Sequence, residues 1–138
     1  MDDLWGILAN TVEAGGEDEV GQTVPRVLVV EDEFLIAREL AAAFEDRGAI
    51  VIGPCATTED ATLQLGACSP TLAVIDINLG KGKSFEVPRL LVERGIPFAF
   101  VTGYDHCVIP HEYSSIPFYQ RPMDTNAFAD EVLELSFR

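Results

Sequence analysis

Cysteine and long apolar runs are scarce in this chain of 138 residues. The three cysteines, Cys55, Cys68 and Cys107, are odd in number and far apart, which suits neither a disulfide framework nor a zinc knuckle. We expect free thiols in a reducing compartment. No apolar run approaches the roughly 18 residues of a membrane span, and the acidic start has the wrong charge for a signal peptide. These absences predict a soluble, cytoplasmic protein.

Positive charge is also in short supply, with 9 Lys and Arg against 23 Asp and Glu and a formal net charge of −14. Such a surface repels nucleic acid and anionic membranes, so we expect neither as a direct partner. Residues 1–25 hold six of the acids and no base, so we divide the chain into an acidic N-terminal tail or linker, 1–25, and one domain, 26–138. A short apolar cluster in the tail leaves two interpretations open: a tail that is weakly ordered or packed on its own domain, or an element that docks on a partner.

Five short apolar runs alternate with stretches of helical periodicity. The runs are apolar at successive positions, not at alternate ones, as strands buried on both faces of a parallel sheet are. We expect strands at 27–30, 50–52, 72–75, 97–101 and 116–119, and helices between Ile36 and Gly48 and at 58–67, 85–94 and 124–136. Strands alternating with helices give a doubly wound α/β domain, and five strands favour the flavodoxin-like order 2-1-3-4-5.

In that order, ligands bind where the first and third strands end. Glu31 and Asp32 follow the first strand, Asp76 follows the third, and Asn78 comes two residues later. Each acid alone has an ordinary explanation, such as a helix N-cap for Asp32 and a turn residue for Asp76. Together at one crevice they repel one another unless a cation neutralises them or their pKa values rise. Oxygen ligands with room for water suit Mg²⁺, and a backbone carbonyl near Asn78 would add another oxygen.

Two further strand ends supply polar groups to the same crevice. Thr102 follows the fourth strand and offers a hydroxyl that can donate to an anion bound on Asp76, and Arg121 follows the fifth and offers a cation. A carboxylate nucleophile, a metal bridging its oxygens and positive groups for the remaining oxygens are the parts that phosphoryl transfer to a carboxylate needs.

Four motifs at four strand ends resemble those of a response-regulator receiver domain: VVEDE at 29–33, VIDIN at 74–78, FVTGY at 100–104 and QRP at 120–122. The resemblance covers about residues 26–136. It implies Asp76 as the phosphorylation site, Glu31 and Asp32 as the Mg²⁺ acids, Thr102 as the switch hydroxyl and Phe118 as the aromatic switch residue.

The string PFAFVTGY at 97–104 resembles the subgroup called FATGUY regulators. That subgroup implies a histidine kinase of the HWE or a related class, or a phosphotransfer protein, as partner. It also implies output through direct protein contact, or a role as phosphate shuttle or sink, with no enzymatic activity beyond the domain's own phosphorylation and dephosphorylation. The oligomeric state is left open.

Two features depart from the receiver pattern. Receivers usually carry Lys where this chain has Arg121, and Arg replaces a compact ammonium with a planar fork, while Lys81 or Lys83 would be alternative cations. Between residues 105 and 115, Pro110 interrupts the expected fourth helix, so we predict that this helix is short, irregular or mobile. The resemblance also implies a cis peptide before Pro122.

Alternative functions come from other classes of protein. Gly80 to Ser84 looks like part of a nucleotide-binding loop, but Ile77 stands where that motif needs its first glycine. A phosphatase with an aspartate nucleophile would carry a second acid where this chain has Asn78. A pseudo-receiver, which has the fold but binds partners without being phosphorylated, is the main alternative because of Arg121.

Overall fold

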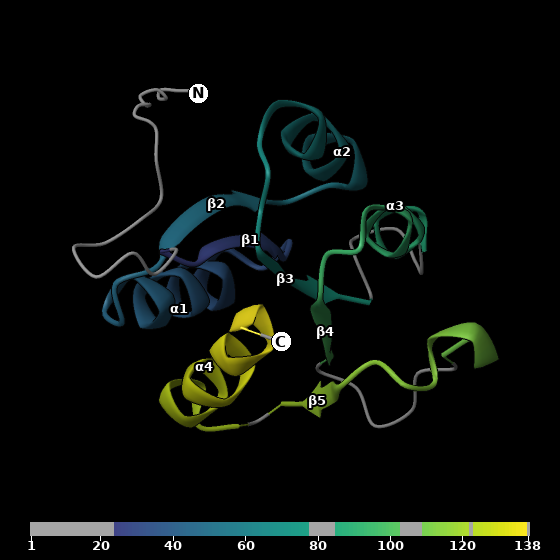
Figure 1. Cartoon of the computed structure of the whole chain (residues 1–138). Helices are drawn as coiled ribbons and strands as arrows, with labels where there is room; N and C mark the ends of the chain where they lie inside the picture. Colours follow the sequence, from purple (N-terminus) through teal and green to yellow (C-terminus); the bar gives the residue numbers. More distant parts are fainter. Residues whose placement is uncertain (1–23, 78–84, 103–108, 122, 138) are drawn as a thin grey trace.

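A computed structural model describes residues 24–77, 85–102, 109–121 and 123–137 of the chain. Five parallel strands form one sheet in the order β2-β1-β3-β4-β5, and four α-helices cover it (Figure 1). The strands are β1 (Arg26–Val30), β2 (Ile50–Cys55), β3 (Leu72–Asp76), β4 (Phe98–Thr102) and β5 (Phe118–Gln120). The helices are α1 (Phe34–Glu45), α2 (Thr58–Ala67), α3 (Glu86–Arg94) and α4 (Thr125–Leu133). The predicted flavodoxin-like fold and strand order are confirmed.

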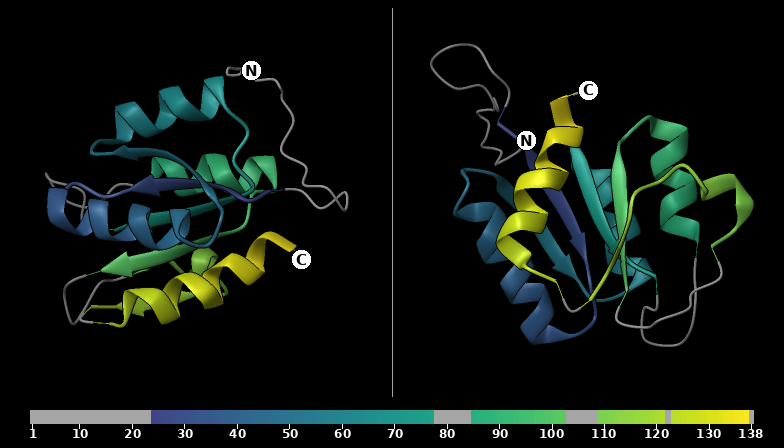
Figure 2. Two further views of the ribbon diagram at one scale, coloured as in Figure 1. Left: turned by 90° about the vertical axis from the view of Figure 1, so that its left-hand side faces the viewer. Right: turned by 90° about the horizontal axis from the view of Figure 1, so that it is seen from below.

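The sheet separates two apolar cores because its central strands bury both of their faces. On one face, Leu28 and Ile75 pack with residues from α2 and α3. On the other face, Val29 and Val74 pack with residues from α1 and α4. Every residue of β3 and β4 is buried, which explains why the sequence shows continuous apolar runs there and no alternation. Figure 2 shows the two helical layers and the strands pointing toward one edge.

Helix ends follow the chemistry of the local sequence. The Thr57 side chain accepts a hydrogen bond from the Asp60 backbone N–H at 3.0 Å and so caps the start of α2. The Asp124 carboxylate accepts from the N–H groups of Asn126 and Ala127 at 3.0 and 3.2 Å at the start of α4. Gly95 ends α3 with a φ of 69°, a left-handed conformation that glycine adopts without strain.

A guanidinium group ties α1 to α4. Arg47 lies beyond the C-terminal end of α1, and its Nε donates to Asp130 Oδ1 on α4 at 2.5 Å. Its Nη1 donates to the Ala43 carbonyl at 2.9 Å and to Asn126 Oδ1 at 3.3 Å. These contacts fix the two helices that cover the same face of the sheet.

The structure corrects three element boundaries. β2 does not end at Gly53 but continues to Cys55, because Gly53 takes a φ of 95° and the β1–β2 pairing shifts register there, with a cis peptide between Gly53 and Pro54. β5 begins only at Phe118. The predicted last helix is α4 followed by a 3₁₀ turn at Glu134–Phe137.

Between β4 and β5, the described residues contain one 3₁₀ turn, His111–Tyr113, in place of the full helix that the receiver pattern has between these strands. Tyr113 anchors it: this side chain is buried, and its ring stacks on Phe85 at 5.6 Å between centroids and meets Phe98 and Phe100 edge-on. The prediction of a short or irregular helix holds for 109–117, while residues 103–108 lie outside the described part of the chain. None of the helices described is long and apolar enough to cross a membrane.

Candidate functional site

The carboxyl edge of the sheet brings together the acids that follow β1 and β3. Asp76 is the last residue of β3, and Glu31 comes directly after β1. Backbone hydrogen bonds fix both positions: Glu31 N–H donates to the Cys55 carbonyl at 2.9 Å, and Ile77 N–H donates to the Val101 carbonyl at 3.2 Å. The placement follows from parallel strand order, because neighbouring parallel strands end at the same edge.

Three carboxylates converge at this edge. One oxygen atom from each of Glu31, Asp32 and Asp76 lies within 4.8 Å of the others. Glu31 is 2% exposed and Asp76 5% exposed, while Asp32 is the most exposed of the three. Buried carboxylates this close to one another require compensating positive charge or a raised pKa.

Arg121 provides positive charge to the cluster and comes from the end of β5, the strand at one edge of the sheet. Its Nη1 donates to Glu31 Oε1 at 2.8 Å, and its Nη2 lies 3.9 Å from Asp76 Oδ2. The backbone of Arg121 is held in place, because its N–H donates to the Thr102 carbonyl at 2.8 Å. One guanidinium therefore reaches two of the three acids.

Glu31 is electrostatically perturbed in spite of this ion pair. Burial of its carboxyl, followed by the charge of Asp76 and a hydrogen bond with it, raises the pKa of Glu31 from 4.5 to about 7. The hydrogen bonds from the Glu33 backbone N–H and from Arg121 act in the opposite direction without cancelling these effects. The cluster is thus short of positive charge.

Comparison with known proteins places this fold in one class. The phyllosphere-induced regulator PhyR of Methylorubrum extorquens is 34% identical over 96 residues, which is 67% of this chain and 36% of PhyR. The solution structure of SdrG from Sphingomonas melonis Fr1 superposes with a TM-score of 0.72 at 29% identity, covering 83% of this chain and 98% of SdrG. The response-regulator receiver domain of Erythrobacter litoralis PhyR superposes with a TM-score of 0.72 at 22% identity, covering 83% of this chain and 91% of that domain.

 No family model matches the chain.

The chain is a response-regulator receiver domain. Its sheet order, its acidic cluster and its likeness to these proteins agree on that class. The chain spans about a third of the length of PhyR, with 36% of PhyR covered. What PhyR does as a whole protein therefore does not carry over with the match.

The other predicted site residues of this receiver domain fall in different surroundings. Thr102 ends β4, is fully buried and lies one residue beyond the register partner of Asp76. Phe118 starts β5 opposite Phe100 and is 37% exposed. Asn78, Lys81, Lys83 and the peptide before Pro122 lie outside the described residues, so the expectations for them stay predictions.

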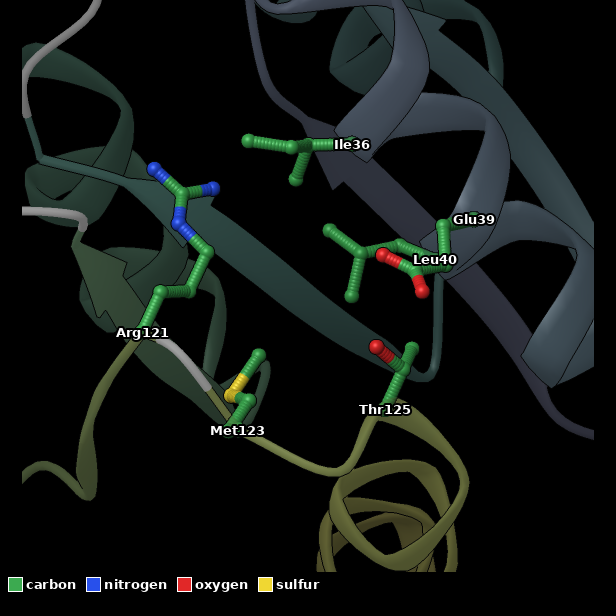
Figure 3. A pocket seen from close by; sticks show the side chains of 6 residues that line it. All are labelled: Ile36, Glu39, Leu40, Arg121, Met123 and Thr125. Carbon is green, nitrogen blue, oxygen red and sulfur yellow. The ribbon is translucent and has the colours of Figure 1, made fainter.

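Sequence reasoning missed two features of the site. It placed Arg121 at the phosphoryl position but did not foresee its direct ion pair with Glu31, since a contact between residues 90 positions apart leaves no local signal. It also missed a pocket of about 300 Å³ beside α1, lined by Ile36, Glu39, Leu40, Arg121, Met123 and Thr125 (Figure 3). The spacing of Ile36 and Leu40 puts both on one apolar face of the predicted helix, a pattern that does not distinguish a packed core from the wall of a pocket.

Proposed function

We propose that this receiver domain is a phosphoacceptor in which Asp76 takes a phosphoryl group from a histidine kinase or a phosphotransfer protein. The observation that carries the proposal is the convergence of Glu31, Asp32 and Asp76 at the carboxyl edge of the sheet, with Arg121 reaching into them. Asp76 ends the central strand β3, and the pairing of β3 with β4 fixes the backbone from which its carboxylate projects. A fixed nucleophile lowers the entropic cost of an in-line attack.

In the proposed reaction, a carboxylate oxygen of Asp76 bonds to the phosphorus of a phosphohistidine as the P–N bond breaks. The bonding electron pair stays on the imidazole nitrogen, and the imidazole leaves as the neutral ring after protonation of that nitrogen. Arg121 lies 3.9 Å from Asp76 and would engage an oxygen of the new acyl phosphate. Water later attacks the phosphorus, which releases inorganic phosphate and restores the carboxylate.

The acidic cluster also fits a divalent cation by the chemistry of its donors. Three carboxylates with oxygen atoms within 4.8 Å form an oxygen-only donor set, which hard cations such as Mg²⁺ prefer. Glu31 and Asp32 would hold Mg²⁺ beside Asp76, where it would neutralise charge on the aspartate and phosphoryl oxygens. Glu31 and Asp76 are buried and Asp32 is exposed, so such an ion would lie at the boundary between the protein and solvent.

The proposed output is a change of surface near β4 and β5. Thr102 would donate to the phosphoryl group, and Phe118 would move as Thr102 does, which alters the surface that partners contact. We propose signalling through protein contact, or phosphate transfer as a shuttle or sink, with an HWE-class histidine kinase as one candidate donor. Enzymatic activity toward other substrates forms no part of this proposal.

A second candidate function is a pseudo-receiver that binds partners without phosphorylation. The observation in its favour is the 2.8 Å ion pair between Arg121 and Glu31, which gives the cluster a cation of its own. In this case partner binding would not respond to Mg²⁺ or to phosphodonors.

The decisive experiment is intact mass after incubation with Mg²⁺ and a small phosphodonor, and in parallel with a phosphorylated histidine kinase. We expect the wild type to gain one phosphoryl group and Asp76→Asn to gain none. Asp46→Asn is a matched control, because Asp46 is an exposed aspartate beyond the C-terminal end of α1 and should not affect labelling. An unlabelled wild type with both donors would favour the pseudo-receiver, and a labelled Asp76→Asn variant would refute the assignment of the nucleophile.

Thr102→Ala separates labelling from signalling. We expect this variant to be phosphorylated nearly as the wild type is, because Thr102 is not the nucleophile, but to lose the response of partner binding to phosphorylation. A full partner response in phosphorylated Thr102→Ala would contradict the switch role of Thr102.

A further inference from the structure

Arg121 contacts Glu31 across most of the width of the sheet. In the order β2-β1-β3-β4-β5, three strand spacings separate β5 from β1, which is ~14 Å between backbones. The side chain nevertheless places Nη1 2.8 Å from Glu31 Oε1. Only 16% of the Arg121 side chain and none of the Glu31 side chain is exposed, so this contact is a buried ion pair.

Both carboxylate oxygens of Glu31 already accept a hydrogen bond. Oε1 accepts from Arg121 Nη1 at 2.8 Å, and Oε2 accepts from the Glu33 backbone N–H at 3.1 Å. A divalent cation that ligates Oε1 would lie next to the guanidinium, and two like charges at such a distance repel strongly in a partly buried site. Glu31 therefore cannot serve both partners equally well in this arrangement.

The guanidinium has the geometry to act as a counter-ion for more than one acid. Its two terminal nitrogens face different carboxylates, Glu31 at 2.8 Å and Asp76 at 3.9 Å. A planar fork can do this, whereas a lysine ammonium is a single point charge. The substitution of Arg for the usual Lys thus changes how the acids are neutralised.

A neighbouring cavity offers a place for a displaced Arg121 side chain. Arg121 lines the pocket of about 300 Å³ beside α1, and Glu39 lines the same pocket. Figure 3 shows the guanidinium of Arg121 near Ile36, at the opening between α1 and the segment that leads into α4. The pocket therefore lies next to the side chain that an ion bound to Glu31 would displace.

We propose that Arg121 is a built-in counter-ion that competes with a divalent cation for Glu31, so that the receiver domain binds Mg²⁺ weakly and its acidic cluster is partly compensated without metal. This inference deepens the proposed function and rests on its metal site. Arg121 is in this respect a positioning residue: it determines how Glu31 is shared between the protein and the ion.

The test is the Mg²⁺ dissociation constant of the full chain, measured by isothermal titration calorimetry at constant ionic strength. We compare the wild type with Arg121→Lys and Arg121→Gln. We expect Arg121→Gln to bind Mg²⁺ roughly tenfold tighter or more, because a unit charge next to the ion is removed, and Arg121→Lys to fall between the two. Arg121→Lys keeps the net charge, so the test does not depend on the folding of Arg121→Gln.

Arg47→Gln is the matched control. This substitution also removes a guanidinium from a carboxylate, that of Asp130. Arg47 follows the C-terminal end of α1, just before β2 begins, and so lies at the amino ends of the strands, away from the acidic cluster. We expect its Mg²⁺ affinity to equal that of the wild type, since solvent and salt screen a charge that lies at the other end of the strands from the acidic cluster.

The outcomes separate this inference from the proposed function. Equal Mg²⁺ affinity in wild type, Arg121→Lys and Arg121→Gln overturns the competition and leaves the metal site in place. An equal gain in Arg47→Gln overturns it too, because the effect would then be one of net charge. No Mg²⁺ binding in any variant overturns both this inference and the metal part of the proposed function, while the mass measurement on Asp76 still decides whether the domain is phosphorylated.

Discussion

The raised pKa of Glu31 predicts how the stability of the metal-free protein changes with pH. Burial and the charge of Asp76 raise this pKa from 4.5 to about 7. Between these two pH values the folded protein keeps a proton on Glu31 that the unfolded chain has lost, so folding is favoured at the lower pH. The contribution is fully present below pH 4.5 and is lost as the pH rises through about 7. A pKa difference of this size corresponds to about 3 kcal/mol, as an upper value because Arg121 can reorient around Glu31.

The perturbation that isolates this effect is Glu31→Gln, which keeps the shape of the side chain and removes the titration. The assay is urea unfolding followed by circular dichroism, without divalent cations, at several pH values from 5 to 8. The wild type should be more stable relative to Glu31→Gln at pH 5 than at pH 8, and the difference between the two proteins should shrink or reverse by up to about 3 kcal/mol across that range. Taking the difference removes the pH dependence of the carboxylates that do not interact with Glu31.

Asp76→Asn tests whether the charge of Asp76 contributes to the raised pKa of Glu31. Because burial is the larger contribution and Asp76 the next, this variant should retain a smaller fall in stability with pH than the wild type. A wild-type protein whose stability relative to Glu31→Gln does not change between pH 5 and 8 would refute the reasoning.

Two more predictions concern the fold and use matched pairs of substitutions. Phe44→Ala removes a fully buried ring between α1 and α4 and should lower the free energy of unfolding by about 3–5 kcal/mol, whereas Phe34→Ala removes a ring that is 70% exposed and should change it little; urea unfolding measures both. Gly53→Ala should destabilise, because φ is +95° and the new Cβ would lie 2.6 Å from the Cys55 nitrogen. Gly66→Ala, in α2 with no atom within 4 Å of the new Cβ, should stabilise by about 0.5–1 kcal/mol. A stabilised Gly53→Ala protein or an unaffected Phe44→Ala protein would contradict the packing described.

Local chemistry in the sequence was enough to predict most of the elements. The continuous apolar runs identified the buried strands, because a strand covered on both faces has no polar side. The pair Thr57 and Thr58 indicated the start of α2, since a threonine hydroxyl can satisfy a free N–H of the first turn, and the structure shows Thr57 in that role. The position of the acidic site also followed from the sequence, because parallel strand order puts the ends of β1 and β3 at one edge.

Features that depend on contacts between distant residues were decided only by the tertiary structure. β2 continues past Gly53 because its partner β1 lies close enough to pair through Val30 and Cys55, and the local Gly-Pro signal alone predicted an end. The stack of Tyr113 on Phe85 brings the segment after β4 onto the α3 face, although nothing near Tyr113 in the sequence indicates that contact.

The amino-acid sequence by itself determined the receiver fold, the edge at which the acids gather and the presence of a cation there. Only the tertiary structure decided that Arg121 pairs with Glu31, that both oxygens of Glu31 are occupied, and that a pocket lies beside the guanidinium. The physical reason is that strand order and helix caps depend on neighbouring residues and on periodicity. The partner of a long charged side chain depends instead on distances across the sheet and on what the surrounding side chains bury.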